Sequence, residues 1–275
     1  MLSLLAVACG FQTIVTTPRG VSFRSLAPRD LGGDVFPTAP APVLDLPGDT
    51  LEELPEHRLI VLGTTALAGA SAVAAASHLA PLEMVVLLAC AFALADLMTG
   101  VFHWATDNYG SLETPLVGPA CAAFQGHHRA PWTITYRSTC NNVFKIAKIV
   151  APLIALVATV ATPPVAFFLI VALYSQILSQ EFHKYSHMKP RDQPPLIRVL
   201  QDNGLAISTK EHGRHHTDPF DGRYCIFNGM LNPLLDNTLF FRRLEALVYR
   251  ISGVEANCWS EGDKGAGVKE LALSL

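Results

Sequence analysis

Histidine is the residue type whose number and spacing most clearly indicate chemistry in this sequence. Ten histidines occur among 275 residues, and eight of them lie between positions 103 and 216 in four clusters. Imidazole is the commonest protein ligand for iron, zinc, copper and nickel. We therefore predict that these eight residues bind metal: His103, His127, His128, His183, His187, His212, His215 and His216.

The spacing within the clusters favours a shared centre over isolated surface histidines. Residues three or four positions apart, such as His183 and His187, project from one face of a helix and can point at a common atom. Eight imidazoles exceed the roughly four ligands of a tetrahedral zinc ion, and a two-metal centre uses them more economically. The six cysteines contain no CxxC pair, which argues against a thiolate zinc site. His57 and His78 stand alone, and we expect both to be ordinary surface residues.

Two acidic residues accompany the first cluster. Asp107 occupies the position where a histidine would complete a His-x-x-x-His pair with His103. We predict that Asp107 is a catalytic residue that binds metal directly, binds it through water or supports His103. Asp96 lies seven residues before His103 and shares its helical face. An uncompensated acid is costly inside a span, so Asp96 is predicted to orient a ligating histidine, the alternative being a capping or packing role.

The clusters flank long apolar runs that can cross a membrane. Between residues 59 and 101 the only charges are Glu83 and Asp96, and Pro81 separates two stretches, 59–79 and 84–102. Each stretch approaches the roughly 20 residues that span a bilayer as a helix. These stretches are predicted to form the first two transmembrane helices.

A third apolar run, residues 149–179, contains no charge and is interrupted by Pro163 and Pro164. It is either one long span or a helical hairpin whose first arm begins near Phe144. A single span would put the first two histidine clusters and the last two on opposite membrane faces, whereas a hairpin gathers all eight at one face. We therefore predict a hairpin, and an all-α membrane protein with about four transmembrane helices.

The distribution of basic residues supports this topology. The two tips of the four-helix arrangement, near residues 78–83 and 161–164, contain no lysine or arginine. All 20 basic residues therefore fall on the histidine side, which the positive-inside rule assigns to the cytosol or its organellar equivalent. The histidine clusters are thus expected to form a cytosolic or stromal cap that carries the metal centre.

The composition agrees with a membrane protein. Hydrophobic residues make up 50% of the chain and charged residues only 16%, against about 25% charged residues in ordinary soluble proteins. This composition excludes a disordered chain. The formal net charge of −3 argues against a nucleic-acid partner.

The chain divides into four segments. Residues 1–29 have an apolar start and no acidic residue, as in a targeting presequence, an ordinary tail being the alternative. Residues 30–58 carry seven acids, one arginine and five prolines, and are predicted to be an acidic linker without a core of its own. Residues 59–260 form the membrane domain, and 261–275 form a tail. The helical periodicity of residues 240–251 predicts a helix that lies on the membrane surface or packs on the protein's own cap.

Four motifs together resemble the signature of a known enzyme family. They are HWATDNYG (103–110), FQGHHRAPWTIT (124–135), QEFHKYSH (180–187) and LQDNGLAISTKEHGRHH (200–216). They are similar to motifs of the Kua-type lipid desaturases, which include plasmanylethanolamine desaturase and the chloroplast palmitate desaturase that acts on phosphatidylglycerol. The similarity runs from about Leu94 to Trp259. The PWTIT, LQDNGLAIS and LEALVYR segments look closer to the chloroplast branch, with which a presequence is consistent.

The resemblance implies a di-iron cap, with two Fe ions that cycle between Fe2+ and Fe3+ and use O2 as co-substrate. It implies removal of two hydrogens from neighbouring methylenes of a phospholipid chain, the favoured substrate being palmitoyl-phosphatidylglycerol and the product a trans double bond. The sequence contains no GxGxxG, haem or iron–sulfur motif, so a separate protein is expected to donate electrons. That donor is ferredoxin in a plastid (chloroplast) membrane, the favoured location, or cytochrome b5 at the endoplasmic reticulum.

Other activities are compatible with the same clusters. A plasmanylethanolamine desaturase would form the vinyl ether of a plasmalogen, and a lipid hydroxylase would differ only in its product. A membrane zinc hydrolase is disfavoured, because the sequence contains no HExxH motif. A non-enzymatic metal-binding membrane protein is the remaining alternative.

Basic and aromatic residues near the clusters are candidates for lipid binding. The cations expected to hold a headgroup phosphate are Arg129, Lys184, Lys210 and Arg214. Trp104 and Trp132 are expected at the boundary between lipid and water. The alternative is ordinary membrane-surface chemistry, since lysine, arginine and tryptophan concentrate there in any case.

Overall fold

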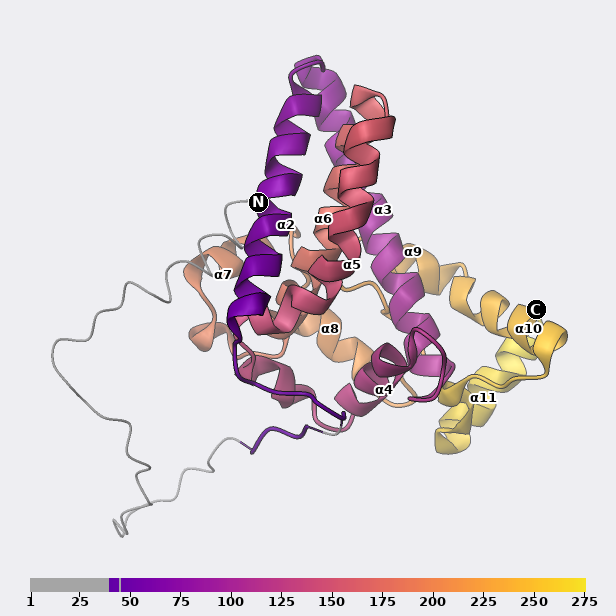
Figure 1. The fold of residues 1–275 in the computed structure, drawn as a ribbon. Helices are drawn as coiled ribbons and strands as arrows, with labels where there is room; N and C mark the ends of the chain where they lie inside the picture. The colour runs from indigo at the N-terminus through magenta and orange to yellow at the C-terminus, as the bar shows by residue number, and fades with distance from the viewer. Residues whose placement is uncertain (1–39, 45) are drawn as a thin grey trace, which may run out of the picture.

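The computed structural model describes residues 40–44 and 46–275, and the regular secondary structure of these residues is entirely helical. The predicted presequence, residues 1–29, lies outside the described residues. Figure 1 shows a bundle of long helices with shorter helices gathered at one end of it. We call this end the cap.

Four long helices make up the bundle: α2 (Pro55–Ala76), α3 (Pro81–Asn108), α5 (Thr139–Val160) and α6 (Pro163–Ser186). All four are long and apolar enough to cross a membrane. They form two hairpins that point the same way, α2 with α3 and α5 with α6 (Figure 1). α2 packs against α5 and α6, and α6 also packs against α3. The prediction of four spans is confirmed, and residues 149–179 belong to a hairpin.

Prolines determine where three of these helices begin. Pro55, Pro81 and Pro163 each lie in the first turn, where the missing N–H costs no hydrogen bond. α5 begins instead after Ser138, whose side chain accepts a hydrogen bond from the backbone N–H of Asn141 at 3.3 Å. As a result, α5 starts five residues before Phe144, and α2 starts inside the predicted linker.

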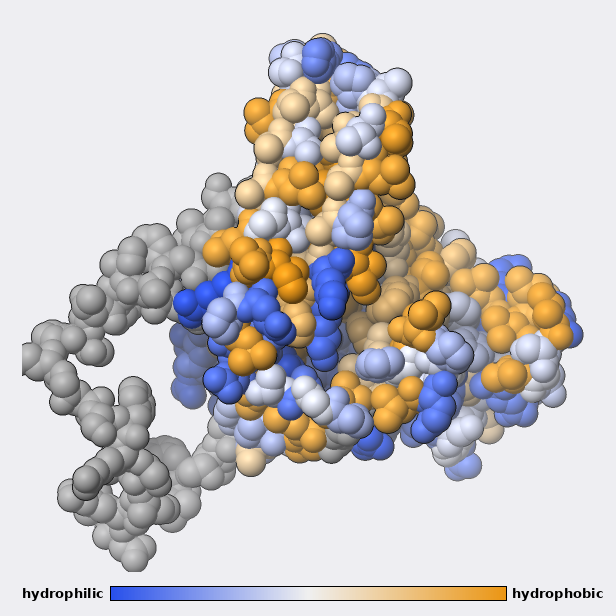
Figure 2. All heavy atoms as spheres, viewed as in Figure 1, coloured by the Kyte–Doolittle hydropathy of each residue, from blue (hydrophilic) through white to orange (hydrophobic). Residues whose placement is uncertain are grey.

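The bundle is apolar on its outside as well as inside. Ala68, Ala95 and Ile154 are fully buried, whereas Leu59 and Leu82 are 75% and 76% exposed. Figure 2 shows apolar side chains on the surface of the bundle between its tips and the cap. Soluble proteins seldom expose such large apolar patches, so this surface fits the hydrocarbon of a bilayer.

The cap consists of shorter elements. They are α4 (Gly118–His127), η1 (Pro131–Tyr136), η2 (Pro190–Asp192), α7 (Pro195–Asp202), α8 (Thr209–His215), α9 (Asn232–Asn237), α10 (Phe240–Ser252), η3 (Asn257–Ser260) and α11 (Gly262–Leu273). The second histidine cluster, expected in a loop, ends the helix α4. The predicted tail forms most of α11, which packs against α10 and η3. α10 buries Phe241 and Glu245 against the cap and leaves Ile251 77% exposed.

Part of the predicted linker packs against η1. The indole of Trp132 donates to the carbonyl oxygen of Ala41 at 2.9 Å, and the backbone N–H of Val43 donates to Thr133 Oγ1 at 3.0 Å. We call residues 40–44 and 46–50 the strap, because this extended segment crosses the cap before α2 begins (Figure 1).

The two lone histidines differ. His78 is exposed in the turn between α2 and α3, as expected. The surface prediction for His57 is wrong, because this residue is 2% exposed. It lies in the first turn of α2, where its ring stacks on Phe144 of α5 with centroids 3.8 Å apart. Its Nδ1 accepts the backbone N–H of Leu54 at 3.3 Å, so His57 caps α2.

Candidate metal centre

The eight predicted histidines and Asp107 come together in two neighbouring groups. They come from the cap ends of α3 and α6, from α4 and α8, and from the residues that directly follow α4, α6 and α8. The five-histidine group is His127, His183, His187, His212 and His216. The mixed group is His103, Asp107, His128 and His215. Within each group the candidate ligand atoms all lie within 4.8 Å of one another.

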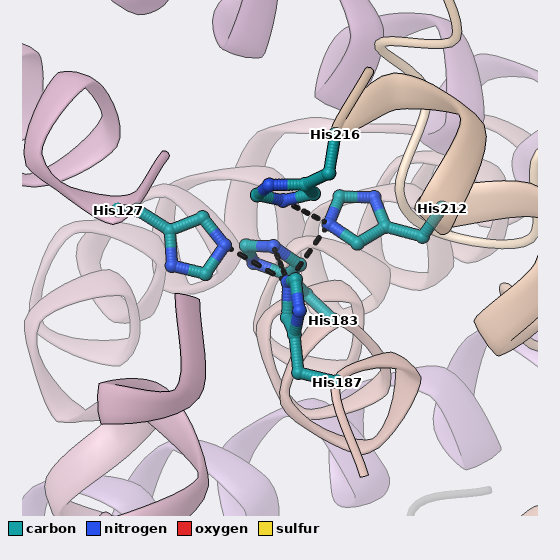
Figure 3. A group of neighbouring side chains, drawn as sticks. All are labelled: His127, His183, His187, His212 and His216. Carbon is teal, nitrogen blue, oxygen red and sulfur yellow. Dashed lines mark hydrogen bonds between the residues drawn. The ribbon is translucent and has the colours of Figure 1, made fainter. Parts of the chain in front are cut away.

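The rings of the five-histidine group turn their Nε2 atoms toward one another (Figure 3). The Nε2 atom of His187 has three such neighbours: His127 at 2.9 Å, His212 at 3.0 Å and His183 at 3.2 Å. A neutral imidazole nitrogen either donates one proton or offers one lone pair, so it cannot make three hydrogen bonds. A shared cation fits this convergence better than shared protons.

The mixed group contains buried polar atoms that lack partners. Asp107 Oδ2 lies 3.2 Å from Nε2 of both His103 and His128, and 3.4 Å from Nε2 of His215. Despite these short contacts, His103 Nε2 and both carboxylate oxygens of Asp107 make no hydrogen bond of acceptable geometry. Buried polar atoms are nearly always paired in native proteins. A metal ion at this point would satisfy them.

Backbone carbonyls orient two of the rings. His103 Nδ1 lies 2.9 Å from the carbonyl oxygen of Tyr224, and His215 Nδ1 lies 2.8 Å from that of Gly222. A carbonyl only accepts, so Nδ1 carries the proton and each Nε2 presents its lone pair to the mixed group. The sequence analysis missed these two residues, because a backbone carbonyl leaves no side-chain signal.

Four of the imidazoles outside the spanning helices, those of His127, His187, His212 and His216, are held neutral. Burial, reinforced by the neighbouring imidazoles, lowers the pKa of His127 and His212 well below the usual value. The same two causes lower the pKa of His187 to about 3 and also lower the pKa of His216. Neutral imidazole is the form that binds metal, so these residues are ready to act as ligands at physiological pH.

Asp96 does not contact a histidine, and the prediction that it orients one directly is wrong. Its carboxylate accepts the backbone N–H groups of Asn228 at 3.0 Å, Gly229 at 2.9 Å and Leu231 at 3.0 Å. The alternative capping role is the one observed. Asp96 thus anchors the segment before α9. The same segment carries the carbonyl group of Tyr224, which orients His103, so Asp96 supports His103 indirectly.

The residues predicted to bind lipid have different environments. Trp104 is 6% exposed and donates to Glu245, and Lys184 is 5% exposed and forms an ion pair with Glu181. The expectation that these two residues face lipid is therefore wrong. Both lie on spanning helices but point toward protein partners. Trp132 is held against the strap. The residues that are exposed, and whose headgroup role stays a prediction, are Arg129, Lys210 and Arg214.

A buried acid that the sequence analysis missed fastens the C-terminal elements to the centre. Glu245 is fully buried, pairs with Arg242, and accepts the indole N–H of Trp104 at 3.1 Å and of Trp259 at 2.9 Å. Nearby, Asn257 Nδ2 donates to the backbone carbonyl of Asp107 at 2.7 Å. The available signal was an acid on the apolar side of the amphipathic segment 240–251.

Similarity to known proteins extends over the region that contains the two groups of donors. A family model described as "Lipid desaturase domain" matches residues 92–259, which include all nine donors. The chain is similar to "Fatty acid desaturase 4-like 1, chloroplastic" of Arabidopsis thaliana, at 40% identity over 177 residues, or 63% of this chain and 60% of that protein. It is 40% identical over 171 residues to "Fatty acid desaturase 4, chloroplastic" of the same plant, covering 62% of this chain and 53% of that protein.

A second kind of relative is more distant. "Plasmanylethanolamine desaturase" of Myxococcus xanthus is 34% identical over 168 residues, covering 58% of each protein. The chain thus spans between half and two thirds of the length of these curated relatives. No solved structure matches the chain significantly.

Proposed function

The chain belongs to the lipid desaturase family, and from this premise we propose that it is an O2-dependent lipid desaturase with a two-iron centre. One observation carries the proposal: nine metal-capable side chains converge in two adjacent groups within the matched region. Two groups of donors suit two ions, whereas a single ion in either group would leave four or five of the nine donors unused.

The donor set fits iron. Imidazole nitrogen with a carboxylate oxygen is a ligand combination that non-haem iron accepts. When bound, the two irons would activate O2 and supply the oxidising power that removes two hydrogens from adjacent methylenes. The carbonyls of Gly222 and Tyr224 hold the His215 and His103 rings in the ligating tautomer, and burial keeps water away from both. Asp107 would bring one negative charge to the mixed group.

Each turnover that reduces O2 needs two external electrons, so we propose a separate donor protein. Ferredoxin fits a plastid membrane, and cytochrome b5 fits the endoplasmic reticulum. The names of the chloroplastic relatives favour the plastid. The histidine-rich cap would then face the stroma, where a soluble donor can reach it.

The favoured substrate is palmitate esterified in phosphatidylglycerol, with a trans product. The higher identity to the fatty acid desaturases, 40% against 34% to the plasmanylethanolamine desaturase, supports an acyl substrate over a vinyl-ether product. A hydroxylase would use the same donor set. The product therefore separates these activities.

Expression in a host that lacks the activity, followed by lipid profiling, tests the proposal. A new unsaturated acyl group on phosphatidylglycerol is expected, together with about two irons per chain in the purified protein. A vinyl-ether or hydroxylated lipid would replace the favoured reaction with one of the alternatives. One zinc per chain, or unchanged lipids from iron-loaded protein supplied with a reductant, would contradict it.

A further inference from the structure

A cavity of about 180 Å3 opens beside the five-histidine group. The strap, α4, η1, α5 and α6 form its walls, and His127 and His183 are among the residues that line it. These segments are far apart in the sequence, and they meet where the strap crosses the cap (Figure 1). The cavity thus leads from the surface to two members of the proposed metal centre.

The walls suit a hydrocarbon chain. Apolar side chains line much of the cavity, among them Val43, Leu46, Phe124 and Ile134. Small residues of α4 leave space, since a side-chain Cβ added at Gly126 would meet only Arg129 Nη2, at 3.9 Å. For comparison, an apolar cavity of about 150 Å3 is large enough to admit benzene. The cavity can therefore receive a segment of an acyl chain.

The rim carries cations, of which Lys145 is the better placed to meet an anion. Arg137 is already occupied, because it pairs with Asp49 and donates to the carbonyl oxygen of Thr50 at 3.1 Å and to Asn141 Oδ1 at 2.9 Å. The side chain of Lys145 is 60% exposed and lies 3.7 Å from Asp49. Two cations and one carboxylate give the rim a net charge of +1.

Lys145 also lies at the depth in the membrane where a phospholipid headgroup is expected. It is in the second turn of α5, and the uncharged run of this spanning helix begins at Ile149. A lysine just outside the apolar part of a span extends its ammonium group to the level of the lipid headgroups. The cavity mouth therefore faces the boundary at which phospholipid phosphates lie.

We propose that this cavity receives the acyl chain of an anionic phospholipid, with the chain between the strap and α4 and the phosphate at Lys145. This inference rests on the proposed function and deepens it by assigning a substrate site. It transfers the headgroup role from Arg129, Lys210 and Arg214 to α5. The reacting methylenes would then lie beside His127 and His183.

Photo-crosslinking tests the site without relying on activity. The full chain is reconstituted in phosphatidylcholine nanodiscs with a phosphatidylglycerol whose acyl chain carries a diazirine, and the labelled residues are mapped by mass spectrometry. We expect labels on the strap and on residues 118–136. Labels confined to the outer faces of the spanning helices, near Leu59 and Leu82, would overturn the inference.

Two variants sharpen the test. Ala123→Phe places a large ring in the cavity and should reduce cavity labelling at least about threefold, while Ala74→Phe, on the exposed face of α2, should not. Metal content per chain should stay the same, which shows that the cap is folded. The milder Ala123→Leu should give a smaller reduction in the same direction. Unchanged labelling in both Ala123 variants would contradict the site.

Charge is tested separately. Lys145→Gln should lower labelling by the phosphatidylglycerol probe by up to about fivefold and leave labelling by a phosphatidylcholine probe unchanged. Lys264→Gln, which removes an exposed lysine of α11 outside the cavity, is the matched control. Equal losses in the two variants would overturn the role of Lys145.

The labelling and activity results together distinguish the inference from the proposed function. Cavity labelling without desaturation would support the substrate site and contradict the proposed function. Desaturation without cavity labelling would support the proposed function and contradict the substrate site.

Discussion

Five of the nine metal-capable side chains are buried, which is costly unless something pairs with them. His103, His212 and His215 are at most 1% exposed, and the carboxylate of Asp107 makes no hydrogen bond. Leaving such groups unpaired costs of order 1–3 kcal/mol each. Metal binding would offset that cost, so folding of the cap and metal binding should be thermodynamically coupled.

Removing a donor from the five-histidine group tests its role. In His183→Ala we expect iron to fall from about two per chain to about one or less, and desaturation to fall at least about 100-fold, because even supporting residues around metal ligands cost 10- to 100-fold. Metal analysis and lipid profiling measure the two effects. His78→Ala, in the turn at the opposite end of the bundle, should change neither. Full iron content in His183→Ala would show that this group does not hold metal.

Asp107→Asn separates a ligand from a purely structural acid. The amide keeps the shape of the side chain and can donate to the histidine nitrogens 3.2 Å away, which the carboxylate cannot. We therefore expect metal-free Asp107→Asn to be more stable than metal-free wild type by about 1–3 kcal/mol. With iron present the order should reverse, because the negative ligand is lost. Thermal unfolding in detergent, with and without a chelator, measures the crossover, and the same order in both conditions would argue against ligation.

At the scale of elements, the C-terminal helices act as a brace for the end of α3. Glu245 of α10 accepts the indole N–H of Trp259 of η3 and that of Trp104, which lies one turn before Asn108. Asn108 in turn accepts the backbone N–H of Cys258 at 3.1 Å. The end of α3 that carries Asp107 is therefore held by α10 and η3.

Glu245→Gln tests this brace. The substitution removes the nearer of the two carboxylates that pair with the buried Arg242 and leaves only Asp221, at 3.6 Å, so it should destabilise the protein by about 3 kcal/mol. Glu255→Gln removes a comparable ion pair with Lys269 at the surface and should have close to no effect. Thermal unfolding in detergent compares the two. Equal stability of both variants would show that α10 and η3 do not support α3.

The sequence was sufficient to predict the elements that depend on local patterns of residues. Uncharged runs and first-turn prolines predicted the four spans, and the requirement that the histidines share one membrane face decided between a hairpin and a single span. Contacts over long distances were not predictable in this way. Trp104 and Glu245 are 141 positions apart, and Trp132 and Ala41 are 91 positions apart, so their pairing depends on how the cap packs. His57 was misassigned for the same reason, since its neighbour Phe144 comes from another span.

At the scale of the whole molecule, two hairpins share a single cap. The membrane topology is therefore the strictest test of the proposed metal centre. The turns at residues 77–80 and 161–162 lie at the end of the bundle away from the eight clustered histidines and contain no lysine or arginine (Figure 1). Because basic residues stay on the cytosolic or stromal side, the cap should face that side and both turns the other. The donors come from chain segments before and after the second hairpin, and they can share a centre only with this arrangement.

Cysteine labelling in sealed vesicles of known orientation shows which side of the membrane the cap and the two turns face. With the exposed native Cys90 replaced by alanine, an impermeant maleimide should reach Ser77→Cys and Thr162→Cys from one side only, and Ser111→Cys and Lys189→Cys from the other. Protein without an added cysteine gives the background. Ser111 precedes α4 and Lys189 follows α6, so these positions report on the two halves of the donor set. If they were labelled from opposite sides, the bilayer would separate the halves, and the two groups of donors could not form.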